Sequence, residues 1–268
     1  MKGKCPFAAM LAALILFSGA SICTAQPETL TVDADASLLG AFSDIGSICT
    51  TMGSFGLLLN FDGAQILRSQ IEGGAYADIF VSDNKTHIDA LAGEGYVQSY
   101  HKFLRTNLSL IVPKSNPANI QNLTDLANPG IRIAIGSNAS PIGAYTQQML
   151  DKLEADPVYG PEYVQNVSNN VIFEGSNDYS IESKVALGEA DAGFAYEANV
   201  TEDLANNITK IEIPEDYSVN VEYYMAILNQ SSSPDLVEDF LNMVENVEGK
   251  GIQVLESYGF EQIWYQPP

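Results

Sequence analysis

Residues 131–145 read IRIAIGSNASPIGAY and hold the unit on which the fold depends. The first five residues form a short apolar run, which predicts a buried strand, and the polar residues 136–140 predict a loop. Pro141 fits the first turn of a helix, where the N–H that proline lacks would have no partner. Strand, loop and helix in this order are half of a βαβ unit, in which helices join parallel strands.

The same order recurs along the chain, so we expect an α/β fold. Further strands are expected at 30–32, 57–61, 78–82, 108–112, 171–173, 191–196 and 222–228. Helices are expected after Ser37 as N-cap, over 65–72, from an Asn84 cap to Leu91, after Asn177-Asp178 as far as about 188, and at about 234–246 and 249–257. The segment 151–170 carries two prolines and is expected to be irregular.

These units fall into two groups that the strands at 107–112 and 222–228 link. We expect one lobe from residues 26–106 and 229–268, and a second lobe from residues 107–228 that includes the two hinge strands. A chain that leaves one lobe and later returns forms a hinge with a ligand cleft beneath it. Helix N-termini would face this cleft, where free N–H groups and the helix dipole favour anions.

Residues 1–25 have the pattern of a signal peptide. Lys2 and Lys4 precede an apolar run at 8–17, and small residues lead to Ala25, so cleavage is expected before Gln26. The mature chain would keep Cys49 alone, which allows no internal disulfide. Eight Asn-x-Ser/Thr sequons reflect either composition or surface glycosylation. The protein is therefore expected to be exported.

Charge and motifs exclude several functions. The chain of 268 residues has 12 basic and 34 acidic residues, a formal charge of −22, which argues against binding to nucleic acid or to an anionic membrane. No His-Glu-x-x-His, Gly-x-Ser-x-Gly or phosphate-loop motif occurs in the sequence. A binding protein is therefore expected rather than an enzyme.

Several segments, in their order and spacing, resemble the exported molybdate-binding proteins of ABC importers. They include QIEGGAYADIF at 70–80, LIVPKSNP at 110–117, PGIRIAIG at 129–136 and VALGEADAGFAY at 185–196. The resemblance extends over about residues 29–260. It implies a two-lobed periplasmic-binding-protein-like fold of type II, with molybdate or tungstate in the cleft and no cofactor or resident metal.

The resemblance also implies the site and its partners. Ser37 matches a serine that donates its hydroxyl and N–H, and Tyr196 matches a tyrosine whose hydroxyl reaches the anion. Ala64, Ile142 and Asp178 match positions that donate a backbone N–H. The implied partners are the oxyanion and ABC permease subunits. The protein is expected to be a monomer, periplasmic or at the cell surface, and either free or tethered to the membrane.

Some positions depart from the family pattern. Ala64 stands where the family has a second serine, and Asp35, Asp62 and Asp178 flank the expected donors. We expect these carboxylates to turn outward, with Asp178 as an N-cap; otherwise the ligand is not a dianion. The alternatives are therefore a binding protein for a different small ligand, a cell-envelope protein that uses this fold as a scaffold and, more remotely, an enzyme.

Overall fold

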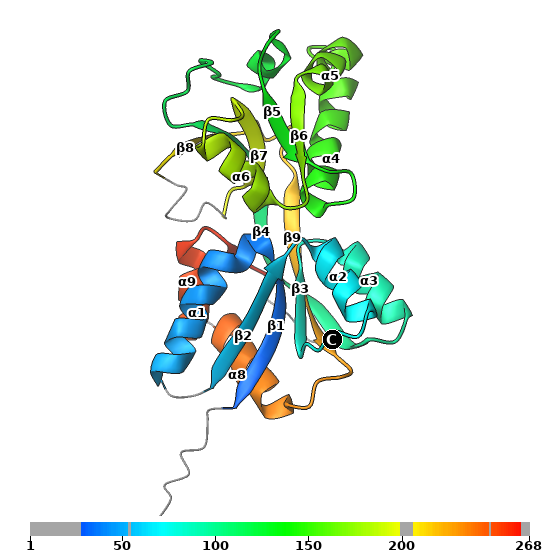
Figure 1. Ribbon diagram of the computed structural model, residues 1–268, viewed down its shortest axis with the longest axis vertical. Coiled ribbons are helices and arrows are strands. Elements are labelled where there is room, and N and C mark those ends of the chain that lie inside the picture. The colour runs from blue at the N-terminus through cyan, green and yellow to red at the C-terminus, as the bar shows by residue number, and fades with distance from the viewer. Residues whose placement is uncertain (1–27, 53–54, 199–205, 247, 264–268) are drawn as a thin grey trace, which may run out of the picture.

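The computed structural model describes residues 28–52, 55–198, 206–246 and 248–263, so the expected signal peptide lies outside the described residues. Two lobes stand one above the other, joined by the long strands β4 (Val97–Pro113) and β9 (Asn220–Leu228) (Figure 1). The strands follow the order β2-β1-β3-β9-β4-β7-β5-β6, and β8 and β10 pair with β4 beside this path. This is the two-lobed α/β fold that the sequence predicts.

The first lobe has a sheet with helices on both faces (Figure 1). Its parallel strands are β1 (Thr29–Asp35), β2 (Gly56–Asp62) and β3 (Ile79–Ser82). The helical elements are η1 (Ala36–Leu38), α1 (Leu39–Met52), α2 (Ala64–Glu72), α3 (Lys85–Gly93), α8 (Pro234–Glu245) and α9 (Lys250–Ser257), and the short β10 (Glu261–Gln262) pairs with β4. β9 pairs antiparallel with β3, so it belongs to this lobe's sheet, although we expected it in the second lobe.

The second lobe repeats the plan. Its parallel strands β5 (Ile133–Gly136), β6 (Val171–Gly175) and β7 (Ala192–Tyr196) join β4 and β8 (Ile208–Ile211), which run antiparallel to one another. Its helices are η2 (Leu123–Ala127), α4 (Pro141–Ala155), α5 (Gly160–Asn169) and α6 (Asp178–Ala186). β4 runs through both sheets, so the lobes share a continuous strand.

Local capping explains where several helices begin. Pro141 lies in the first turn of α4 behind a Ser140 N-cap, and the Asn84 side chain caps α3, as predicted. The prediction of a Ser37 N-cap is wrong, because Asp35 caps η1 by accepting from the backbone N–H two residues later. Asn177 rather than Asp178 caps α6.

The prediction that 151–170 is irregular is also wrong, since α4 continues to Ala155 and α5 fills 160–169. The two prolines mark the turn between the helices and the first turn of α5, where proline is tolerated. The lone Cys49 is buried in α1, as expected for a small packed side chain. Among the described residues, no helix has the length and apolar character to cross a membrane.

Candidate functional site

A set of anion-binding donors lies where β1 meets η1, and a carboxylate of the chain itself occupies it. Oδ1 of Asp35 accepts from the backbone N–H of Ser37 at 3.1 Å and from the Ser37 hydroxyl at 2.7 Å. Oδ2 of Asp35 accepts from the backbone N–H of Ala64 at 3.2 Å. N–H groups in the first turn of a helix have no partner inside the helix, so they are free to hold an anionic oxygen.

Asp35 therefore points inward, and only 2% of its surface is exposed, although we expected it to turn outward. Two of the expected donors, Ser37 and Ala64, meet at its two oxygens. Ser37 also accepts a hydrogen bond from the Tyr223 hydroxyl at 2.8 Å, which fixes the direction of its own hydroxyl. The first lobe thus presents a preorganised group of neutral donors around one negative charge.

A second carboxylate, Asp83, lies near the first because β1 and β3 are parallel neighbours. The carboxyl ends of parallel neighbouring strands reach the same edge of a sheet, so Asp35 and the turn after β3 come together. The charge of Asp35 raises the pKa of Asp83, so the two carboxyl groups lie close enough to interact.

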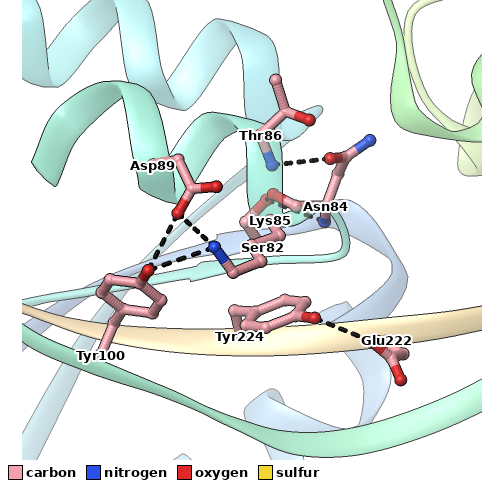
Figure 2. Close-up of polar contacts among 8 residues, drawn as sticks. All are labelled: Ser82, Asn84, Lys85, Thr86, Asp89, Tyr100, Glu222 and Tyr224. Atoms are coloured by element: carbon pink, nitrogen blue, oxygen red, sulfur yellow. Dashed lines mark hydrogen bonds and ion pairs between the residues drawn. The ribbon is translucent and has the colours of Figure 1, made fainter. Parts of the chain in front are cut away.

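The turn that carries Asp83 is held by its neighbours (Figure 2). The Ser82 hydroxyl donates to the carbonyl oxygen of Asn84 at 2.8 Å and accepts from its N–H at 3.0 Å. The Asn84 side chain accepts from the N–H of Thr86 at 2.8 Å and so starts α3. These local bonds direct the intervening Asp83 side chain into the protein, where 1% of its surface is exposed.

The second lobe binds directly to this turn. The Tyr196 hydroxyl donates to Oδ2 of Asp83 at 2.5 Å, and the Tyr145 hydroxyl donates to the Asp83 backbone carbonyl at 2.7 Å. The other carboxylate oxygen of Asp83, Oδ1, is buried and accepts no hydrogen bond from a described residue. The rings of Tyr145 and Tyr223 both stand edge-on to Tyr196. Tyrosines from three elements thus enclose the carboxyl pair.

Two further hydrogen bonds join the lobes nearby. The Gln65 amide donates to the carbonyl oxygen of Ser176 at 2.8 Å, and the Asn177 amide donates to Asp62 at 3.3 Å. Gly63 allows this approach, because a Cβ at that position would lie 2.5 Å from the Ser176 carbonyl oxygen. The lobes are therefore in direct contact around the site.

Burial and the repulsion between the two carboxyl groups shift the pKa values of Asp35 and Asp83. Burial raises the pKa of Asp35, and hydrogen bonds from Ser37 and Ala64 oppose part of this rise. Burial also raises the pKa of Asp83 well above its usual range, and the charge of Asp35 adds to the rise. Of the described residues, no Lys, Arg or His forms a hydrogen bond or ion pair with either carboxyl group. A buried pair of carboxyl groups without a positively charged partner favours the protonated form of one of them.

Asp178 and Ile142, the other expected site residues, begin helices of the second lobe. Asp178 is the first residue of α6, which packs against η1; it is buried, and its charge raises the pKa of Asp83. Ile142 is the second residue of α4, and its side chain is part of the hydrophobic core. One carboxyl pair is therefore surrounded by four of the expected site residues, Ser37, Ala64, Tyr196 and Asp178. Ile142 lies in the same helix as Tyr145, and it is Tyr145 that contacts the turn of Asp83.

Sequence reasoning missed Asp83, Tyr145 and Tyr223. Asp83 follows a predicted strand directly, and polar residues at that position of a parallel strand face a ligand site in many α/β folds. Tyr223 and Tyr145 carry no such local signal, because β9 and α4 bring them to the site from distant parts of the sequence. Within the described residues, no group of three or more His, Cys, Asp or Glu side chains is arranged to hold a metal ion.

Residues 30–261 match the sequence model of the bacterial extracellular solute-binding proteins. The chain belongs to this family. The match spans nearly all of both lobes, so the donors and carboxylates above lie within a solute-binding protein. The molybdate-binding protein ModA of Mycobacterium tuberculosis is 28% identical over 262 residues, which are 94% of each chain.

Solved structures agree on the fold. The periplasmic molybdate-binding protein of Azotobacter vinelandii superposes with a TM-score of 0.72 at 19% identity, covering 88% of this chain and all of the other. The sulfate-binding protein SubI of Mycobacterium tuberculosis gives 0.75 at 18% identity, covering 88% and 87%. At these sequence identities, the structural similarity shows that the chain has the fold of a type II binding protein.

Proposed function

We propose that this chain is the extracytoplasmic binding subunit of an ABC importer, and that it carries molybdate or tungstate to permease subunits in the membrane. The observation that carries the proposal is the convergence of the Ser37 N–H, the Ser37 hydroxyl and the Ala64 N–H on one pair of charged oxygens. The molybdate-binding relative from Mycobacterium tuberculosis supports this choice of oxyanion.

In this proposal the Asp35 carboxylate stands in for two oxygens of the solute. A tetrahedral oxyanion offers charged acceptors of the same kind, and a hydrogen bond to a charged acceptor contributes about 1.5–3 kcal/mol. The oxyanion takes over these donors while the Asp35 carboxyl group turns aside. Binding therefore competes with an interaction inside the protein, which lowers the affinity relative to a site without the aspartate.

The second lobe supplies the remaining donors of the proposed site. They are the Tyr196 hydroxyl and the first-turn N–H groups of Ile142 and Asp178, at the starts of α4 and α6. Contacts from both lobes to one solute form only when the lobes are closed, so the solute shifts the population toward the closed form. The proposed protein acts as a monomer, free in the periplasm or held at the cell surface.

A second candidate is a solute that brings hydrogen-bond donors or positive charge, such as an amino acid. The inward carboxyl groups of Asp35 and Asp83 favour it. At an effective dielectric constant of about 20, a carboxylate ~6 Å from a dianion opposes it by about 5 kcal/mol before screening. The same carboxylate attracts an ammonium group, so this candidate avoids that cost.

Calorimetry of the mature protein with molybdate, tungstate, sulfate and a mixture of amino acids separates the candidates. The oxyanion proposal expects submicromolar binding of molybdate or tungstate, weakened about 10- to 100-fold in Ser37→Ala and Tyr196→Phe by the loss of one hydrogen bond to a charged group. Ser168→Ala and Tyr100→Phe are matched controls outside the site and should bind as the parent does. Binding of amino acids alone would replace the first candidate by the second.

A further inference from the structure

Resting on the proposed oxyanion function, we propose that the Asp35–Asp83 pair determines solute specificity and makes solute binding proton-linked. The free protein holds one proton between Asp35 and Asp83, and the complex holds a second one. In the binding step a proton from solvent forms an O–H bond on the Asp35 carboxylate as the oxyanion displaces it. Both aspartates are then neutral and both can donate to the bound oxyanion.

The geometry gives the first argument. The donors that an oxyanion needs, at Ser37 and Ala64, already bind the Asp35 carboxylate at 2.7–3.2 Å. The oxyanion cannot take them unless Asp35 gives them up. Asp35 is the terminal residue of β1, which pairs with both β2 and β3, so its carboxyl group stays at this edge of the sheet. A displaced Asp35 therefore remains beside the negative solute.

The groups that surround the pair come from four elements of the fold. Asp178 faces it from α6, Tyr196 from β7, Tyr223 from β9 and Tyr145 from α4. These groups are acidic or neutral, and none can supply a positive charge. A dianion in this enclosure must therefore be compensated by protons, which can reach the carboxyl groups as the lobes open and close.

Asp83 itself is built to hold such a proton. Its Oδ2 accepts from Tyr196 at 2.5 Å, whereas its buried Oδ1 accepts from no described donor. An oxygen that receives no hydrogen bond is poorly suited to carry charge but suited to carry a proton and donate it. Burial and the charge of Asp35 raise the pKa of Asp83 well above its usual range, in agreement with this arrangement.

Specificity follows from the shared proton. A neutral carboxyl group donates a stronger hydrogen bond to a more basic oxygen, and the oxygens of molybdate and tungstate are more basic than those of sulfate. The Asp35–Asp83 pair thus favours oxyanions of weaker acids, in addition to any selection by the size of the site. Raising the pH removes the second proton and weakens binding.

The test is calorimetry of molybdate binding to the mature protein, in two buffers of different ionisation enthalpy at each pH. We expect uptake of about one proton at neutral pH, and a dissociation constant that rises about tenfold per pH unit between about pH 6 and pH 8. Asp35→Asn removes the carboxylate that takes up the proton and keeps a donor, so its proton uptake should fall and its pH dependence flatten. Asp151→Asn, on an exposed part of α4, should behave as the parent does.

The possible results of this calorimetry separate the proton linkage from the proposed function. Molybdate binding without proton uptake and with a constant affinity overturns the proton linkage and leaves the proposed function in place. Full proton uptake in Asp35→Asn overturns the assignment to this pair. If the variant does not fold, the proton count of the parent still decides the linkage. No binding of any oxyanion at any pH overturns the function and the inference together.

Discussion

Replacing Tyr196 by phenylalanine should release the contact between the lobes while leaving the second lobe's core intact. The phenylalanine ring fills the same space, and Tyr196 is completely buried, so the change removes only the hydroxyl group. That hydroxyl donates to Asp83 of the other lobe at 2.5 Å. Loss of the bond leaves a buried acceptor without a partner and should cost about 1–3 kcal/mol.

The lost free energy should change the equilibrium between the closed and open arrangements of the lobes. Because the bond crosses between lobes, it exists only while they are closed, so the ratio of closed to open protein should fall about 5- to 150-fold. Tyr223→Phe is the matched control, since its hydroxyl donates to Ser37 within the first lobe at 2.8 Å. That variant should lose stability without favouring the open form.

Small-angle scattering of the ligand-free protein and thermal unfolding measure the two effects. Tyr196→Phe should increase the radius of gyration, lower the unfolding midpoint by about 2–4 °C per kcal/mol lost, or do both, whereas Tyr223→Phe should change only the midpoint. A Tyr196→Phe protein with an unchanged radius and an unchanged midpoint would refute the account of the inter-lobe contact. Equal expansion of both variants would contradict its localisation to the Tyr196 bond.

Three other changes test neighbouring features. Burial raises the pKa of Asp83 in the folded protein. The stability that this group contributes is therefore complete below its unfolded pKa of about 3.9 and is lost as the pH rises toward the folded pKa. Urea unfolding measured across that pH range should show a smaller loss of stability for Asp83→Asn. Gly63→Ala should hold the lobes apart, because its Cβ would meet the Ser176 carbonyl at 2.5 Å, and the radius of gyration should exceed that of Gly93→Ala, whose Cβ meets nothing within 4 Å. Asn177→Ala should cost about 1 kcal/mol in chemical unfolding through the lost α6 cap, and an unchanged midpoint would contradict the capping role.

The sequence by itself determined the order of most strands and helices, because these depend on neighbours within a few residues. The apolar run before Gly136 makes β5, and Pro141 starts α4, through local burial patterns and backbone restrictions. The family resemblance followed from the same ordered segments. Where local signals compete, as with Asp35 and Ser37, the sequence predicted the wrong cap.

Only the tertiary structure decided what the site contains. Asp35 and Asp83 meet because β1 and β3 are parallel neighbours, and Tyr196 reaches them because the second lobe lies against the first. The direction of the Asp35 side chain depended on a free N–H at Ala64, which is 29 residues away in the chain. Hydrogen-bonding groups far apart in sequence are matched through packing, and packing is a property of the whole fold rather than of any short segment.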